Sequence, residues 1–250
     1  MSKLVPKKAM VLAAGLGSRM RPLTKTIPKP MITVGEKPLI DHVLDRLESA
    51  GIIEVVVNTH YLAKKLETHL EKRKTPKIQI SREEKLLDTG GGVNNVLKHL
   101  KDGPFYVINS DAFWLDGPFD TIVRMAETWE DDKMDGLLLL HSTVEAYGYD
   151  GIGDFLTNSN GCLNRPLEGH VSPWLFAGIQ LLHPRLFKNA PNGAFSLNYL
   201  YDKSIETERL YGTIHDGEWF HVGSPKGIED AENYLQQRYA GNRPGTRHRS

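Results

Sequence analysis

Positive charge and glycine are concentrated in the segment LAAGLGSRMRPLTKTIPKPM, residues 12–31, which we call the glycine–proline loop. It contains Gly15, Gly17 and four cationic side chains, but no aspartate or glutamate. Glycine can turn backbone N–H groups toward an anion, because it reaches φ > 0 without a Cβ clash. Arg19 could form a forked contact with phosphate oxygens, and prolines on both sides restrict the backbone of Lys29. These features favour the binding of an extended anion such as a triphosphate over a solvated basic loop.

Two better-known phosphate loops do not fit this segment. A dinucleotide-binding loop needs a third glycine where this chain has Met20, and it leads directly into a long helix. Prolines at positions 22, 28 and 30 prevent such a helix. The string G-x-x-x-x-G-K-[ST] of the Walker loop does not occur in the sequence. The basic groups must therefore act along an extended, proline-stiffened path.

Two further segments place polar or flexible residues directly beside expected strands. The apolar stretch 105–109 is followed closely by Asp111. Ligands of open parallel sheets gather at the carboxyl ends of strands, so Asp111 is well placed to hold Mg²⁺, although it could instead cap a turn or helix. The D-T-G-G-G segment, residues 88–92, precedes an expected helix that Asp88 or Thr89 could cap.

The string A-A-G-L-G-S-R-M-R-P-L-T-K-T-I-P-K-P, which begins at Ala13, resembles the signature of the sugar-1-phosphate nucleotidylyltransferases. That signature is G-x-G-[ST]-R-[ML]-x-P-L-T-x-x-x-P-K-P, and every fixed position is filled here. The resemblance implies that the loop wraps a nucleoside triphosphate, with Arg19 on the leaving pyrophosphate and Lys29 near the α-phosphate or the sugar phosphate. It also implies that Asp111 binds the metal ion that bridges the phosphates. Arg19, Lys29 and Asp111 are therefore the expected catalytic residues.

Other segments extend the resemblance to the nucleobase and the sugar. In the family, a segment like D-T-G-G-G approaches the base, and a strand like residues 174–179 lets its backbone reach sugar hydroxyls. The nucleotide-binding residues expected on this basis are Ala13, Ala14, Gly15, Gly17, Ser18, Arg19, Asp88, Thr89 and Gly90. The expected sugar-binding residues are Asn164, Ala177 and Gly178, of which no strict motif fixes Asn164.

One position departs from the family pattern. The second metal carboxylate of the family usually lies in a late V-D-V-G-T string, where this chain has F-H-V-G-S with His221. Histidine is a poorer Mg²⁺ ligand than a carboxylate and suits softer ions better. Asp111 and His221 are the expected metal residues, with Mg²⁺ as the cofactor and Mn²⁺ as the alternative. Without ligation by His221, water and substrate phosphates would complete the site; loss of activity is the other alternative.

Apolar strands alternate with amphipathic helices over the first half of the chain. Strands are expected at 8–13, 54–58, 77–81, 105–109 and 136–141, and helices from Pro38 to a stop at Gly51 and at 62–72, 91–100 and 119–129. This alternation predicts a mostly parallel sheet covered on both faces. The second half is expected to hold a hairpin at Asn160-Gly161, strands at 174–183 and 218–222, a helix at 196–206 capped by Ser196, and a last helix from Ser224-Pro225.

With the resemblance, these elements predict a Rossmann-like three-layer α/β/α fold. Its central sheet is mixed but mostly parallel, and a small β-rich lid binds the sugar. Residues 1–240 are expected to form one catalytic domain, with a nucleotide-binding half at 1–120 and a sugar-binding half at 121–240. Residues 241–250 are expected to be a basic disordered tail.

Composition argues against several other classes of protein. Lysine plus arginine and aspartate plus glutamate both total 31 in 250 residues, so net charge does not favour a nucleic-acid or membrane-surface binder. No apolar run approaches the ~20 residues of a membrane span. Cys162 is the single cysteine, so no intrachain disulfide can form, and we expect a cytoplasmic protein. Its expected partners are a nucleoside triphosphate and a sugar 1-phosphate, in a monomer or small homo-oligomer.

The resemblance leaves the substrate pair open. The short chain and the D-T-G-G-G segment look most like the N-acetylmuramate 1-phosphate uridylyltransferases of cell-wall recycling. Mannose-1-phosphate guanylyltransferase is the main alternative, and glucose-1-phosphate transferases follow. Because some members of the fold are regulatory and non-catalytic, and because His221 replaces an expected carboxylate, that class stays a further alternative.

Overall fold

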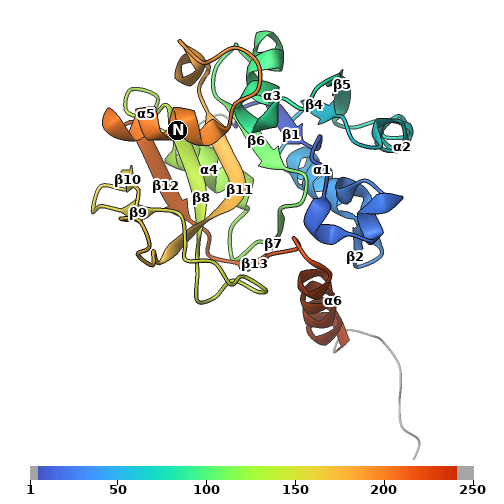
Figure 1. The fold of residues 1–250 in the computed structure, drawn as a ribbon. Coiled ribbons are helices and arrows are strands. Elements are labelled where there is room, and N and C mark those ends of the chain that lie inside the picture. Colours follow the sequence, from blue (N-terminus) through green and yellow to red (C-terminus); the bar gives the residue numbers. More distant parts are fainter. Residues whose placement is uncertain (1–4, 241–250) are drawn as a thin grey trace, which may run out of the picture.

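A seven-stranded sheet in the order β12-β8-β11-β6-β1-β4-β5 runs through the centre of the protein (Figure 1). This is a computed structural model, and it describes residues 5–240. The strands are β1 (Lys8–Leu12), β4 (Glu54–Thr59), β5 (Lys77–Arg82), β6 (Phe105–Asn109), β8 (Gly136–Ser142), β11 (Trp174–Leu182) and β12 (Leu210–Ile214). β11 pairs antiparallel with both β6 and β8, whereas the other neighbours pair in parallel. The predicted mixed, mostly parallel sheet is confirmed.

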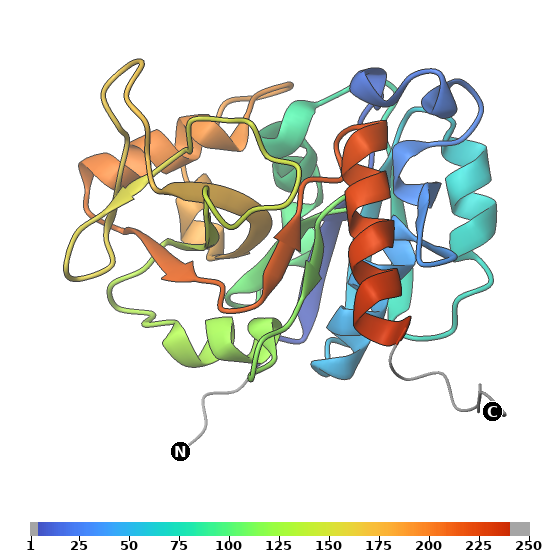
Figure 2. The ribbon, with the colours of Figure 1, turned by 90° about the horizontal axis from the view of Figure 1, so that it is seen from below.

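Helices cover both faces of this sheet (Figure 2). Successive side chains of β1 point to opposite faces of the sheet and are apolar on both, since Ala9 and Val11 belong to one core cluster and Met10 to the other. Both faces therefore need a covering layer. The first cluster is covered by α1 (Leu39–Ser49), α2 (Ala63–Leu70) and α4 (Thr121–Thr128), and the second by α3 (Asp88–Val96) and α5 (Leu197–Glu206). The three-layer arrangement is therefore confirmed, with two apolar cores separated by the sheet.

The glycine–proline loop forms three short 3₁₀ turns instead of a helix. They are η1 (Ser18–Met20), η2 (Leu23–Lys25) and η3 (Lys29–Met31), and the small hairpin β2 (Thr33–Val34)–β3 (Lys37–Pro38) follows. The prediction that the prolines exclude a long helix is confirmed. α1 begins one residue after Pro38.

The last helix, α6 (Pro225–Ala240), packs beside this loop (Figures 1 and 2). Buried residues of the loop and of β2, among them Met20 and Val34, form a third core cluster with Ala231 of α6. The Glu232 carboxylate also accepts a hydrogen bond from the Gly35 N–H at 2.7 Å. The first loop and the last helix of the described chain therefore share one small core.

Short paired strands complete the second half. The hairpin β9 (Leu156–Thr157)–β10 (Leu163–Asn164) confirms the predicted turn, and Gly161 there has a φ of +84°. β7 (Phe113–Leu115) pairs antiparallel with β13 (Glu218–Phe220). Two further 3₁₀ turns are η4 (Leu97–His99) and η5 (Pro184–Phe187).

The short strands and the helix caps differ in how well they were predicted. β7 and β12 were not predicted from their short sequences. The expected N-cap of α3 at Asp88 or Thr89 is wrong, because the helix begins at Asp88 and its N-cap is Leu87, which makes no side-chain cap hydrogen bond. Among the described residues, the Asp88 carboxylate accepts only from the adjacent Thr89 N–H, at 2.6 Å. The Ser196 cap of α5 is confirmed, since its side chain accepts from the Asn198 N–H.

Two of the expectations concern the ends of the chain and the membrane. The expected basic tail, 241–250, lies outside the described residues. Within residues 5–240, no helix is both long enough and apolar enough to cross a membrane.

Candidate active site

A cleft of about 430 Å³ lies at the carboxyl ends of β1, β4 and β6. Its walls are the glycine–proline loop, Asn58 near the end of β4, the residues around the start of α3, and the end of β6 with the segment that follows it. The predicted site residues that line it are Ala13, Ala14, Gly15, Gly17, Ser18, Arg19, Lys29, Asp88, Thr89 and Asp111. The cleft therefore brings together residues from three widely separated parts of the sequence, all at the edge where parallel sheets bind ligands.

The glycine–proline loop is held in place by backbone geometry and a buried threonine. Gly17 has a φ of +61°, and an added Cβ there would lie 2.9 Å from Thr24 Cγ2. Thr24, which is fully buried, donates its hydroxyl to the Gly17 carbonyl at 2.8 Å. Within the described residues, the exposed Arg19 side chain makes no hydrogen bond and no ion pair. Its guanidinium is thus available to an anion that enters the cleft.

Lys29 and Asp111 meet across the cleft as an ion pair. The Lys29 ammonium donates to Asp111 Oδ2, and their side chains are 15% and 32% exposed. Lys29 comes from η3 and Asp111 from the segment after β6, so the pair bridges two walls of the cleft. The Asp111 carboxylate, which is expected to bind a metal ion, is therefore already paired with the Lys29 ammonium.

His221 lies close to this pair without contributing to the walls of the cleft. Burial lowers the pKa of its imidazole, and the positive charges of Arg19 and Lys29 lower the pKa further, while Asp111 and Asp150 oppose the shift. A Cβ on Gly223 would lie 2.5 Å from the His221 Nε2, so glycine at 223 leaves room for the ring. The expected metal residues are therefore electrostatic neighbours, and the ring is biased toward its neutral, ligand-competent form.

Histidine, cysteine and carboxylate groups do not otherwise gather here. Within residues 5–240, no group of three or more such side chains is arranged to hold a metal ion. A divalent ion at Asp111 would need most of its ligands from water and substrate phosphates, which Mg²⁺ accepts readily. The donor set fits a metal that arrives with a polyphosphate better than a preformed protein cage.

The three glycines of D-T-G-G-G pack against the protein. The Cβ position of Gly90 is filled by the Phe195 ring, and that of Gly91 by the Gly193 carbonyl. Gly90 accordingly does not line the cleft, whereas Asp88 and Thr89, just before it, do. Close packing of α3 therefore accounts for the glycines, and the two residues before them face the ligand space.

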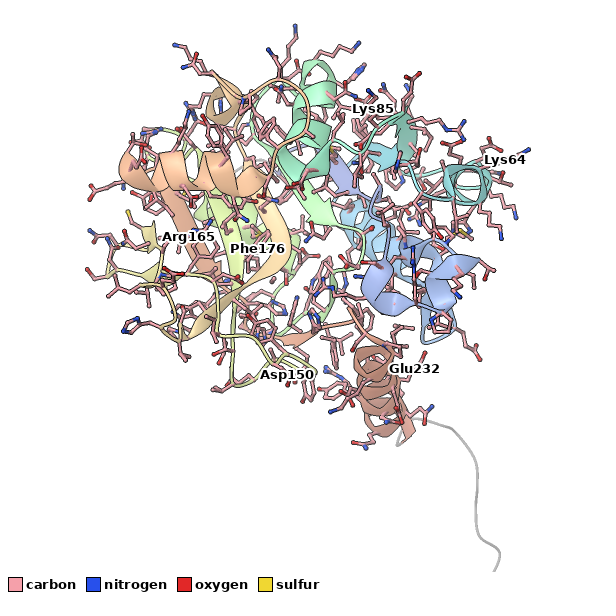
Figure 3. The ribbon with its side chains drawn as sticks, viewed as in Figure 1. Lys64, Lys85, Asp150, Arg165, Phe176 and Glu232 are labelled. Atoms are coloured by element: carbon pink, nitrogen blue, oxygen red, sulfur yellow. The ribbon has the colours of Figure 1, made fainter. Side chains whose placement is uncertain are left out.

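The expected sugar-binding residues lie apart from the cleft walls. Gly178, with a φ of +80°, sits at an irregularity in β11, and a Cβ there would approach Asn109 Nδ2 at 3.0 Å. The Ala177 carbonyl accepts from Trp219 Nε1 at 3.0 Å. Asn164 is exposed on β10, and its neighbour Arg165, on the β9–β10 side in Figure 3, is ion-paired with Asp202. Gly178 thus packs closely against Asn109, which lines the cleft.

Two asparagines of the cleft were missed from the sequence. Asn58 and Asn109 both line it, and each stands at the end of a buried apolar strand. The rule that singled out Asp111, a polar residue at the carboxyl end of a parallel strand, would have found both.

Comparison with known proteins agrees with the signature of the loop. Residues 8–238 match the family described as nucleotidyl transferase. The chain is 39% identical over 237 residues to the N-acetylmuramate alpha-1-phosphate uridylyltransferase of Caulobacter vibrioides, covering 93% of this chain and 98% of that protein. It is 28% identical to the mannose-1-phosphate guanylyltransferase catalytic subunit beta of Danio rerio, covering 88% of this chain and 62% of that protein.

A solved structure supports the fold independently. A putative glucose-1-phosphate thymidylyltransferase from Bacillus anthracis superposes with a TM-score of 0.77 at 19% identity, covering 92% of this chain and 95% of that one. The match over residues 8–238 and the 39% identity of a full-length relative establish the kinship. The chain belongs to the nucleotidyl transferase family of enzymes.

Proposed function

We propose that the protein transfers a uridylyl group from UTP to N-acetylmuramate 1-phosphate, releasing pyrophosphate. The observation that carries the reaction type is the cleft in which Arg19, Lys29 and Asp111 converge. The choice of substrates is supported by the relative from Caulobacter vibrioides, which matches over almost its full length.

In this reaction an oxygen of the sugar phosphate attacks the α-phosphorus of UTP in line. The bond between the α-phosphorus and the bridging oxygen breaks, and pyrophosphate leaves with the electron pair. Such a displacement needs positioning and charge neutralisation rather than a covalent nucleophile. The free guanidinium of Arg19 would neutralise the leaving pyrophosphate, and backbone N–H groups around Gly15 and Gly17 would bind the phosphate chain.

Lys29 must leave Asp111 for this chemistry. In the ligand-free cleft its ammonium is held by the carboxylate. The phosphates of the substrates offer a stronger negative charge, so the ammonium would move to the α-phosphate or the sugar phosphate. Asp111, with His221 beside it, would then hold Mg²⁺, or alternatively Mn²⁺, and the ion when bound would screen the charge of the phosphates.

Guanylyl transfer to mannose 1-phosphate is the second candidate. It is favoured by the similarity to the mannose-1-phosphate guanylyltransferase subunit of Danio rerio, although identity and coverage are both lower there. We also propose that the enzyme works in the cytoplasm, as a monomer or small homo-oligomer, without nucleic-acid or membrane partners.

A substrate panel tests the proposal. The protein is incubated with each of UTP, GTP, CTP and dTTP, with Mg²⁺ or Mn²⁺, and with N-acetylmuramate, mannose, glucose and N-acetylglucosamine 1-phosphates, while pyrophosphate release is followed. We expect UTP with N-acetylmuramate 1-phosphate to dominate. A dominant pair of GTP and mannose 1-phosphate would replace the proposal by the second candidate, and no release with any pair would support a non-catalytic role.

A further inference from the structure

A buried chain of hydrogen bonds joins the carboxyl ends of three neighbouring strands. The Ala13 N–H, just after β1, donates to Asn58 Oδ1 at 2.7 Å, and Asn58 Nδ2 in β4 donates to Glu83 Oε1 at 2.7 Å. The other carboxylate oxygen, Glu83 Oε2, accepts from the Leu87 N–H at 3.0 Å. Asn58 and Glu83 are only 3% and 5% exposed. We call Glu83, Asn58 and the Ala13 amide the strand-end relay.

The donors and acceptors of the relay fix each other's orientation. A backbone N–H can only donate, so Ala13 requires the oxygen of the Asn58 amide. The Asn58 nitrogen must then face Glu83, whose carboxylate accepts from it and from the Leu87 N–H at once. No other common side chain of this size accepts at two atoms without also presenting a donor. The carboxylate therefore determines which way the Asn58 amide points.

The relay ends on two walls of the cleft. Ala13 belongs to the glycine–proline loop, and Leu87 immediately precedes Asp88, the first residue of α3. Asn58 itself lines the cleft, whereas Glu83 does not. Gly92 of α3 packs directly on the pair, because a Cβ there would lie 3.0 Å from Asn58 Nδ2 and 3.1 Å from Glu83 Oε1. Both walls and α3 are therefore held to one buried carboxylate.

We infer that Glu83 is a positioning residue for the nucleotide, acting through Asn58 to hold the two walls of the cleft at the spacing that a bound triphosphate requires. The inference rests on the proposed function, because it takes the cleft to be the nucleotide site. Glu83 does not line the cleft, so its inferred effect is to set the Ala13 amide and the Leu87–Asp88 turn before the ligand arrives.

Exchanging the chemistry of the two side chains tests the inference. In Glu83→Gln the new amide must place one of its donors against either the Asn58 nitrogen or the Leu87 N–H. In Asn58→Asp two carboxylates face each other. In the double variant the new carboxylate at 58 accepts from Ala13 and from the new amide at 83, whose oxygen accepts from Leu87. All donors are then satisfied again, with the charge of the pair unchanged.

The measurement is the dissociation constant of UTP, by calorimetry at a temperature well below the melting point of every variant. We expect each single variant to bind UTP at least about tenfold more weakly than the wild type, because each loses one hydrogen bond in a buried network. The double variant should return to within about threefold of the wild type. Amide hydrogen exchange at Ala13 should accelerate in Glu83→Gln and slow again in the double variant.

A control separates positioning from a general loss of stability. Asp116, away from the cleft walls, accepts hydrogen bonds from the Trp114 indole at 3.0 Å and the Thr121 N–H at 3.2 Å. Asp116→Asn should lower the melting temperature and leave UTP affinity unchanged. Wild-type affinity in Glu83→Gln, or a double variant no better than the single ones, overturns the inference alone. A wild-type protein that binds no nucleotide overturns it together with the proposed function.

Discussion

Replacing Lys29 by methionine should change metal binding and turnover in opposite directions. In the ligand-free cleft the Lys29 ammonium and the Asp111 carboxylate form an ion pair, with side chains 15% and 32% exposed. Two unit charges about 4 Å apart attract by about 4 kcal/mol at an effective dielectric constant of about 20. Desolvation and lost side-chain freedom offset much of this, which leaves a net of about 1–2 kcal/mol for a half-buried pair. A metal ion that binds Asp111 must overcome that net attraction.

Lys29→Met keeps the length of the side chain and removes its charge. The ligand-free variant should therefore bind Mn²⁺ about 5–30-fold more tightly than the wild type, which is the same 1–2 kcal/mol expressed as a ratio of dissociation constants. Turnover should fall by about a hundredfold or more, since the phosphates lose a cation. Mn²⁺ affinity is measured by electron paramagnetic resonance of the free ion, and turnover by pyrophosphate release.

The matched control is Lys25→Met, because Lys25 is exposed on the same loop and lines no part of the cleft. It should leave both quantities near wild-type values. Unchanged or weaker Mn²⁺ binding in Lys29→Met would refute the reasoning that Lys29 and the metal ion compete for Asp111.

Four further variants test the site and its support. Asp111→Asn should reduce pyrophosphate release below detection while the melting temperature stays close to wild type, and residual turnover above about a hundredth would exclude a metal-binding role. Gly17→Ala should lower the free energy of unfolding by about 1–3 kcal/mol, because alanine is strained in the left-handed backbone and its Cβ approaches Thr24. The melting temperature should fall by several degrees. Gly15→Ala, where an added Cβ meets nothing within 4 Å, should change stability by less than about 0.5 kcal/mol, and equal losses in the two would contradict this account. Burial lowers the pKa of His215 below its ordinary value of 6.5, so as pH falls below 6.5 the unfolded chain binds the proton first, and stability decreases until the pH has passed the folded pKa. Melting curves from pH 7 to pH 5 should therefore decline less steeply for His215→Gln, and an identical slope would argue against His215 as a cause.

Elements with a strong local pattern were predictable from the sequence. In α1, the buried face is formed by Leu39, Ile40, Val43, Leu44 and Leu47, at the spacing of a helix with one apolar side. Strand β12 gave no such pattern, because Gly212 weakens a strand locally. Packing explains why position 212 is a glycine, since a Cβ there would lie 2.6 Å from Leu140 Cδ1. The need for glycine at this position arises from a neighbouring strand and cannot be seen in the sequence of β12 itself.

In the candidate site, too, local features could be predicted from the sequence and long-range contacts could not. Arg19 and Lys29 lie within one short segment, so their joint presence in the cleft could be expected. The cap of α3 was mispredicted because Thr89 has a distant partner: its hydroxyl accepts from the Leu197 N–H at 2.9 Å. Glu83 and Asn58 are likewise 25 residues apart, and only the pairing of β4 with β5 brings them together. Interactions of this kind follow from topology and cannot be read from local spacing.

The shared core of α6 and the glycine–proline loop has a consequence for biosynthesis. During translation the loop leaves the ribosome about two hundred residues before α6. Until then Met20 and Val34 lack the cover that Ala231 and its helix provide. A nascent chain can assemble β1, β4, β5 and β6 well before this last helix arrives. The glycine–proline loop, although made long before α6, thus reaches its final packing only when α6 is present, and a chain that stops before residue 225 would hold the sheet without a fully packed loop.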